Sequence, residues 1–348
     1  MTNKRIIGFD ALRLAAIVGV IAIHVSYPPL YHLSENSYAW WVSNIVESLL
    51  RWVVPAYFML SGALLLSKDE PISVMFTRRL PRILVPFLFW TQIYILLTLY
   101  QGSKQTYIEL LYKSISGPAY YHLWFVYTLI GLYIATPLIR QLIKQARIQL
   151  IEYFLVLWFL FSSLFPLINK LLHIKLGISI PFVDGYIGYF VLGYYIYNYP
   201  LPARTRKYAY FLTYLSWLIV ILGTYTLTIS SGKYDDFFHQ YLALPVIINS
   251  IAIFTYFQHM KWSTKNIITE LSSKINIGRI SYGIYLSHLL VMYWLQKSVF
   301  HLNGSTFHPV AGIFLTTLVT FSLCFTFFYL LERLSKYIVI NVISRLIY

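Results

Sequence analysis

Long apolar stretches alternate with short polar loops along the whole chain, and this pattern predicts the fold class. Each stretch has roughly the 20 residues that a helix needs to cross a bilayer. We therefore expect an all-α, polytopic membrane helical bundle of about ten transmembrane helices. The predicted spans cover residues 7–29, 41–66, 83–100, 122–139, 148–168, 182–199, 208–229, 237–258, 280–300 and 310–331.

The composition supports a membrane protein. Hydrophobic residues make up 58% of the chain and charged residues only 11%, and the mean hydropathy is +0.64. Soluble domains contain about 25% charged residues, so a soluble helical protein with very apolar core helices fits poorly. The 32 Tyr and nine Trp fit aromatic belts at the two membrane interfaces.

The net charge of +15 first suggests a nucleic-acid partner, but the chain has no basic arm or recognition motif. Positive charge retained on the cytoplasmic side explains the excess better. Of the 27 Lys and Arg, the N-terminus, the loops after even-numbered spans and the C-terminal tail hold nineteen, the opposite loops hold five, and the spans hold three. This asymmetry predicts that both termini are cytoplasmic.

The single Cys324 excludes an internal disulfide and a cysteine-based metal site, and we expect no metal. The N-terminus is basic and then apolar, as in a signal peptide, but its apolar run is too long and no small-residue cleavage site follows. We expect a retained first helix and one membrane domain over residues 1–348, without an appended soluble domain.

The first predicted span carries three polar side chains that are costly to place in a membrane. Arg13 and His24 are eleven residues apart, so they lie about 20° apart around a helix, and Asp10 and Arg13 can meet at i, i+3. Such residues usually face a sheltered interior and indicate a site. A neutral His24 could act as a general base toward a hydroxyl, or it could be a packing histidine. Our catalytic candidates are His24, Arg13 and Asp10.

A basic cluster at Arg78, Arg79 and Arg82 precedes the third span, with Pro81 suited to the first helical turn. Guanidinium groups beside the free N–H groups of a helix start form a good phosphate site. The same cluster could simply orient the chain in the membrane.

Five further residues are candidates for substrate binding. His122 and Trp124 open the fourth span, where the His could touch an acceptor or face water and the Trp could anchor the interface. His288 lies near the middle of the ninth span and needs a partner, so a site role and a packing role both remain open. Glu47 and Arg51, at i, i+4, are best explained as an ion pair within the membrane.

Six features follow one another along the chain: Asp10, Arg13 with ten residues before His24, FMLSG at 58–62, RRLPRILVP at 78–86, HLWF at 122–125 and SYGIYLSH at 281–288. Together they resemble the acyltransferase-3 family of integral membrane acyltransferases. Within this family the chain is most similar to the branch of the enterobacterial common antigen O-acetyltransferase. The resemblance covers essentially the whole chain.

The resemblance implies an enzyme of the bacterial inner (plasma) membrane that transfers an acyl group to a hydroxyl of a cell-surface polysaccharide or lipid-linked glycan. The implied donor is cytoplasmic acetyl-CoA, with succinyl-CoA as an alternative. Arg79 and Arg82 would then hold the CoA phosphates. His24 would act as base or brief acyl carrier, and Arg13 would hold the cofactor or stabilise developing negative charge.

Intramembrane charges also occur in transporters, so a flippase or exporter of a polysaccharide or lipid-linked sugar remains an alternative. The chain shows no inverted repeat, which disfavours this alternative. If the enzyme hypothesis holds, we expect one sheltered crevice to join Arg13 and His24 to Arg79 and Arg82.

Overall fold

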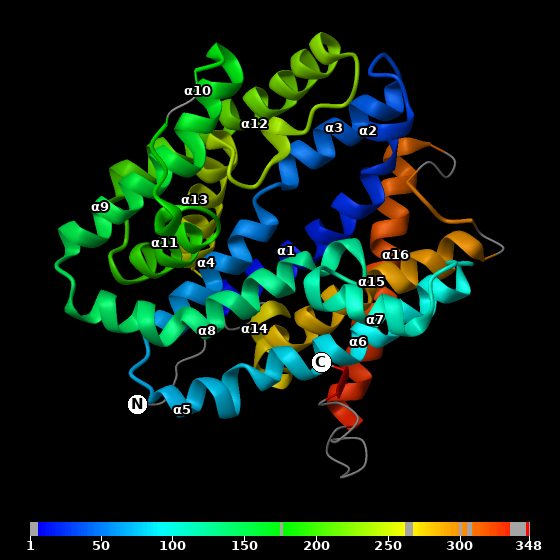
Figure 1. The fold of residues 1–348 in the computed structure, drawn as a ribbon, viewed down its shortest axis with the longest axis horizontal. Coiled ribbons are helices and arrows are strands. Elements are labelled where there is room, and N and C mark those ends of the chain that lie inside the picture. The colour runs from blue at the N-terminus through cyan, green and yellow to red at the C-terminus, as the bar shows by residue number, and fades with distance from the viewer. Residues whose placement is uncertain are drawn as a thin grey trace.

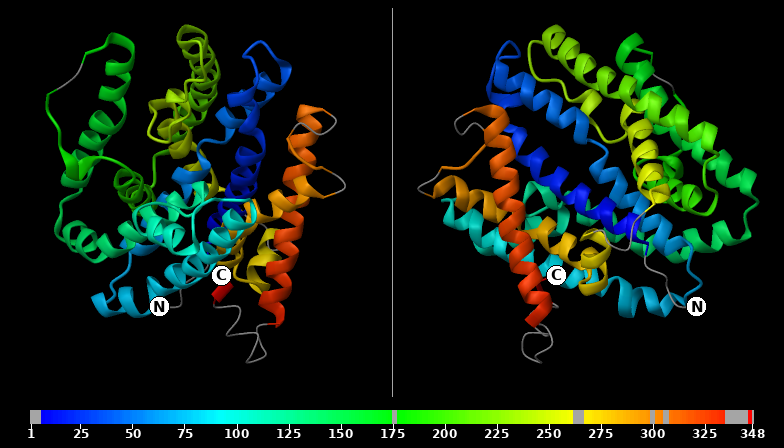
Figure 2. Two further views of the ribbon diagram at one scale, coloured as in Figure 1. Left: turned by 45° about the vertical axis from the view of Figure 1, so that its right-hand side comes forward. Right: turned by 180° about the vertical axis from the view of Figure 1, so that it is seen from behind.

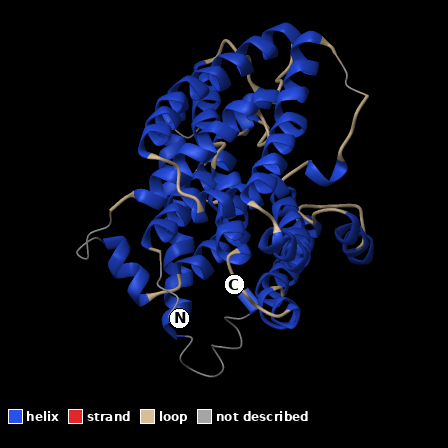
Figure 3. Cartoon of the chain, turned by 90° about the vertical axis from the view of Figure 1, so that its left-hand side faces the viewer, coloured by secondary structure: helices blue, strands red, loops and turns tan. Residues whose placement is uncertain are grey.

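The computed structural model describes residues 6–174, 177–261, 267–298, 301–304, 308–334 and 346–347. All regular structure in these ranges is helical (Figures 1 and 3). The long helices are α1 (Ile7–Ser26), α3 (Tyr38–Leu50), α4 (Val53–Leu66), α6 (Pro81–Tyr100), α8 (Trp124–Gln145), α9 (Ile148–Phe159), α11 (Ile187–Asn198), α12 (Ala203–Ser231), α13 (Leu244–His259), α15 (Ile277–Lys297) and α16 (Pro309–Leu334).

Shorter helices connect or extend these elements. The short α-helices are α2 (Pro28–His32), α5 (Ile72–Val74), α7 (Tyr107–Ser116), α10 (Phe165–Leu172) and α14 (Ile267–Lys274). Two π-helical turns, η1 (Met75–Arg79) and η3 (Leu160–Leu164), and three 3₁₀ turns, η2 (Tyr121–Leu123), η4 (Pro181–Val183) and η5 (Phe237–His239), complete the set.

The described residues contain eight helical segments that are long and apolar enough, by length and composition, to cross a membrane. They coincide with eight of the predicted spans. The other two predicted spans fall on α11 and α15, which do not qualify by length and composition. Helix α11 has 12 residues and is therefore only about 18 Å long. The count of ten spans and the cytoplasmic placement of the termini remain predictions.

Helix α1 lies at the centre of the bundle and contacts α3, α4, α13, α15 and α16 (Figures 1 and 2). Most of its residues are buried, whereas α9 and α12 lie at the periphery. One face of α12 exposes a continuous apolar stripe, formed by Phe211, Leu215, Leu218 and Leu222. A stripe of this kind is expected against lipid tails. The most sheltered position in the fold is therefore given to the helix that carries Arg13 and His24.

Helices α4 and α11 cross at two glycines. A Cβ atom added to Gly62 would lie 1.7 Å from the backbone oxygen of Phe190, and one added to Gly193 would lie 2.0 Å from that of Met59. The two backbones therefore touch at these glycines. Small residues allow membrane helices to approach this closely.

Replacement of either crossing glycine by alanine should destabilise the protein. In Gly62→Ala and Gly193→Ala the new methyl group forces the two backbones apart, at a cost of about 1–3 kcal/mol or more. The thermal unfolding midpoint of purified protein in detergent measures this effect. Gly131→Ala is the matched control, because it lies within α8 and its added Cβ would meet no described atom within 4 Å apart from the neighbouring part of its own helix. An unchanged midpoint for both crossing variants would contradict this packing.

Candidate active site

Arg13 and His24 both face α15, which runs beside α1 in the same direction. Near the start of the pair, a Cβ placed on Gly278 would lie 3.6 Å from Arg13 Nε. Ten residues further along α15, the rings of His288 and His24 have centroids 5.1 Å apart. The prediction that Arg13 and His24 share one protected face is therefore confirmed. Asp10 is buried beside them and accepts a hydrogen bond from Arg13 Nη1 at 2.8 Å.

Three histidines from three separate elements meet at the far end of this face. His24 comes from α1, His122 from η2 and His288 from α15. The ring centroid of His122 lies 6.3 Å from that of His24 and 5.3 Å from that of His288. Within the described part of the chain, no group of three or more His, Cys, Asp or Glu side chains is placed to hold a metal ion. Imidazole side chains can in general transfer protons and form hydrogen bonds.

Hydrogen bonds fix the protonation of His288. Its Nδ1 lies 2.7 Å from the backbone oxygen of Tyr285 and 3.2 Å from that of Ile284. Since a carbonyl oxygen can only accept, Nδ1 carries the proton and Nε2 is left as an acceptor. That Nε2 and both ring nitrogens of His122 are buried and have no hydrogen-bond partner among the described residues. Buried polar atoms of this kind are costly unless a ligand or water satisfies them.

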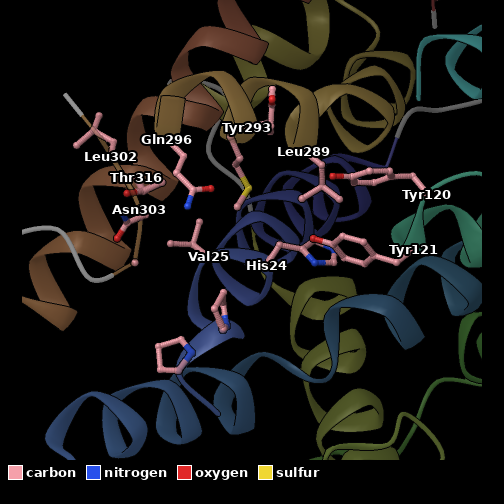
Figure 4. Close-up of a pocket in the computed structure, with 14 residues that line it drawn as sticks. His24, Val25, Tyr120, Tyr121, Leu289, Tyr293, Gln296, Leu302, Asn303 and Thr316 are labelled. Atoms are coloured by element: carbon pink, nitrogen blue, oxygen red, sulfur yellow. The ribbon is translucent and has the colours of Figure 1, made fainter. Parts of the chain in front are cut away.

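A cavity of about 440 Å³ opens beside His24 (Figure 4). His24 and Val25 line it from α1, and Tyr120 and Tyr121 line it from the segment that leads into η2 and α8. Leu289, Met292, Tyr293 and Gln296 of α15, Thr316 of α16, Pro28 and Pro29 of α2, and Leu302, Asn303 and Gly304 of the loop before α16 complete the lining. The size is typical of a small-molecule site, about 300–1,000 Å³.

None of the five substrate-binding candidates, His122, His288, Trp124, Glu47 and Arg51, belongs to the lining of this cavity. The ring of Trp124 stacks on that of Tyr241, with centroids 5.7 Å apart. Glu47 and Arg51 form the predicted ion pair, which is almost fully buried, and Ser26 Oγ donates to Glu47 at 3.2 Å. The substrate-binding role predicted for all five residues therefore stays a prediction, while the ion pair of Glu47 and Arg51 is confirmed.

Next to this ion pair lies a polar chain that the sequence did not indicate. His239 joins Ser48 Oγ, 3.0 Å from its Nε2, to the Tyr234 hydroxyl, 2.6 Å from its Nδ1. Nothing in the spacing could reveal it, because Ser48 and His239 are 191 positions apart. Together with the ion pair it forms a closed polar cluster between α3 and η5.

The basic cluster lies at the opposite end of α1 and is larger than the sequence indicated. Arg79, in η1, binds both carboxylate oxygens of Glu70. Arg140 of α8 donates to the backbone oxygens of Leu65 and Glu70 at 2.8 and 3.0 Å. Arg78 and Arg82 are exposed, and α6 begins at Pro81 as predicted. The sequence analysis did not select Glu70 and Arg140, because charged residues in a loop beside a span are explained equally well by the rule that orients the chain in the membrane.

Two pKa shifts follow from this crowding. Burial would raise the pKa of the Glu70 carboxyl, but the hydrogen bond and charge of Arg79 outweigh it and hold that pKa below its usual value. Burial and the neighbouring guanidinium of Arg79 lower the pKa of Lys68. Glu70 is therefore ionised at neutral pH and occupies Arg79, whereas acidification through its pKa would release Arg79 for another anion.

Arg13 lies close enough to the basic cluster for its charge to act on the same groups. The guanidinium groups of Arg13, Arg79 and Arg82 all lie within electrostatic range of the Tyr133 hydroxyl. The cavity at His24, however, includes none of these arginines in its lining. The expected crevice is thus not found as an extension of this cavity. Tyrosine side chains lie between the two ends instead: the hydroxyls of Tyr57, Tyr282 and Tyr285 donate to the backbone oxygens of Arg13, Ile83 and His122.

These features define a class, a polytopic membrane protein with a basic cluster at one end of its central helix and, at the other end, a cavity lined in part by His24. The model of one protein family, described as the acyltransferase domain, matches residues 6–329, so the chain belongs to the acyltransferase-3 family of membrane acyltransferases. Comparison with curated proteins and with solved structures finds no match. Closeness to the enterobacterial common antigen branch stays a prediction.

If the basic end holds an anionic donor, the double variant Arg79→Ala with Arg82→Ala should bind CoA about tenfold or more weakly, because charge-assisted bonds to phosphate are lost. Glu70→Gln should bind CoA more tightly, because it removes the carboxylate that competes for Arg79. Titration of CoA into purified protein in detergent measures both effects. Arg147→Ala, an exposed arginine before α9, is the control. Equal affinity for CoA in the double variant and the control would show that the donor does not bind at Arg79 and Arg82.

Proposed function

We propose that this protein is a membrane O-acyltransferase of a bacterial plasma membrane, with its basic end in the cytoplasm. The acyl donor is acyl-CoA, in the first instance acetyl-CoA, and the acceptor is a hydroxyl of a cell-surface polysaccharide or lipid-linked glycan. The observation that carries the proposal is the position of His24 beside a cavity, on the same helix face as Arg13, within a chain that belongs to an acyltransferase family.

The basic end supplies the positively charged guanidinium groups that can bind the phosphates of CoA. Arg79 and Arg82 bind the phosphates, with Arg78 at the exposed margin. Arg13 lies closer to the interior and contributes a guanidinium to the cofactor or to developing negative charge. The pantetheine arm then follows α1 toward His24, a rise of about 16 Å. The tyrosines between the two ends must move to admit it.

At the far end, His24 acts on the acceptor hydroxyl. His24 removes the hydroxyl proton as the oxygen attacks the thioester carbonyl carbon and a new C–O bond forms. The C–S bond then breaks, the CoA sulfur leaves as a thiolate, and the proton held by His24 restores the thiol. The net products are an ester and CoA. His288, whose Nδ1 donates to a backbone oxygen, packs its ring against that of His24 and can hold the orientation of His24 by this contact.

A covalent route is the alternative use of the same geometry. His24 itself would attack the thioester and carry the acyl group to the acceptor. Rapid quenching of protein and acetyl-CoA without acceptor, followed by mass analysis, separates the routes: acylated His24 supports the carrier and its absence supports the base. A mass increase equal to acetyl or succinyl on the released glycan identifies the group transferred.

His24→Ala should abolish acyl transfer while the protein stays folded, since loss of a general base typically costs about 10²–10⁴ in rate. Transfer of label from acetyl-CoA to glycan in membranes measures it. Gel filtration in detergent checks folding. His32→Ala, an exposed histidine at the end of α2, is the control. Unchanged transfer in His24→Ala would remove the catalytic role, and unmodified glycan crossing the membrane would favour a flippase.

A further inference from the structure

The cavity beside His24 carries no formal charge. None of the residues that line it is Asp, Glu, Lys or Arg. This is notable in a chain with net charge +15, where cations gather at the other end of α1. Lys297, the neighbour of Gln296 in sequence, is exposed and does not line the cavity. A ligand in the cavity therefore meets neutral groups on every described side.

These neutral groups are arranged to hydrogen-bond. Gln296, Asn303 and Thr316 lie across the cavity from His24 and Tyr121 (Figure 4). The hydroxyl of Thr316 is buried, with 1% of the residue exposed, and has no hydrogen-bond partner among the described residues. A buried hydroxyl without a partner is costly, so a ligand that satisfies it gains binding energy.

The nearest buried charged residues do not give the cavity a net charge. Arg51 lies within electrostatic range of His24, but it pairs directly with Glu47. The two charges cancel to first order, and neither residue lines the cavity. A carboxylate or phosphate placed in the cavity would lose its hydration without gaining a cationic partner, which is unfavourable. Hydroxyl and amide groups would meet matching donors and acceptors instead.

The remaining lining suits the apolar faces of a sugar ring. Tyr120, Tyr121 and Tyr293 present rings, and Leu289 and Met292 present aliphatic surface. Largely apolar walls with a few directed polar groups are typical of sites that orient one small neutral molecule.

We propose that this cavity is the acceptor subsite and that it selects an uncharged sugar ring over a uronic acid or a phosphorylated sugar. The inference rests on the proposed function and narrows its acceptor class. Gln296 and Thr316 are the specificity-determining residues, because they place neutral polar groups opposite His24. The reaction that supplies the acceptor must therefore deliver a neutral glycoside with a free hydroxyl.

The test compares sugars that differ only in charge. Methyl glucoside and methyl galactoside are each paired with the corresponding uronide, and binding to purified protein in detergent is measured by saturation-transfer NMR competition. At least one neutral member should bind about tenfold or more tightly than its uronide, because the uronide must bury an unpaired carboxylate. Equal binding within both pairs, tighter binding of the uronides, or no binding of any of the four overturns the proposal.

A charge change in the cavity gives a second readout. Gln296→Arg should shift the preference toward the uronide of the pair that binds, and Thr316→Val should weaken the neutral member. Gln101→Arg is the control, because Gln101 is exposed beyond the end of α6 and does not line the cavity. An unchanged ratio in Gln296→Arg, with the protein folded by gel filtration, places the acceptor elsewhere.

The same panel separates this inference from the proposed function. Release of CoA thiol from acetyl-CoA is recorded with each sugar. Equal acylation of the neutral and charged sugars contradicts the proposed selectivity but agrees with the proposed acyltransferase function. Selective binding of the neutral sugar without any acyl transfer contradicts the proposed function but agrees with a cavity that binds neutral sugars.

Discussion

The packing of the helices depends on sheltering one guanidinium and one imidazole that a single membrane helix carries. Charged groups in the bilayer are costly unless protein surrounds and pairs them. Here α15 runs parallel to α1, placing Gly278 against Arg13 and His288 against His24. Asp10 neutralises Arg13 at one end, and two further imidazoles accompany His24 at the other. The central position of α1 follows from this requirement.

The two ends of α1 differ in electrostatic character. One end gathers Lys68, Arg79 and Arg140 around the carboxylate of Glu70. The other end is a neutral cavity with hydroxyl, amide and imidazole groups. Tyrosines hydrogen-bonded to backbone oxygens separate the two. This division suits a donor rich in phosphate at one end and an uncharged acceptor at the other.

Sequence pattern predicted the helical class, the buried face of α1 and the Glu47–Arg51 pair, because each depends on helical periodicity within one segment. His122 and His288 could be selected as unusual residues in apolar segments, but only the fold brings them to His24. Arg140 and Glu70 were not selected, since loop charges beside a span fit the orientation rule. Helix α11 was predicted as a span because its sequence is apolar, yet its 12 residues pack against α4 through Gly193 and fall short of membrane thickness.

The sidedness of the reaction tests the central claim most directly. The protein is reconstituted into sealed vesicles, and the fraction with the basic end outward is determined by labelling the loop that contains Arg79. Labelled acetyl-CoA is then supplied outside, with a neutral glycoside trapped inside. The account predicts labelled ester in the lumen and free CoA outside, in proportion to that fraction. Ester formed only when donor and acceptor share one face would contradict an active site that spans the two ends of α1.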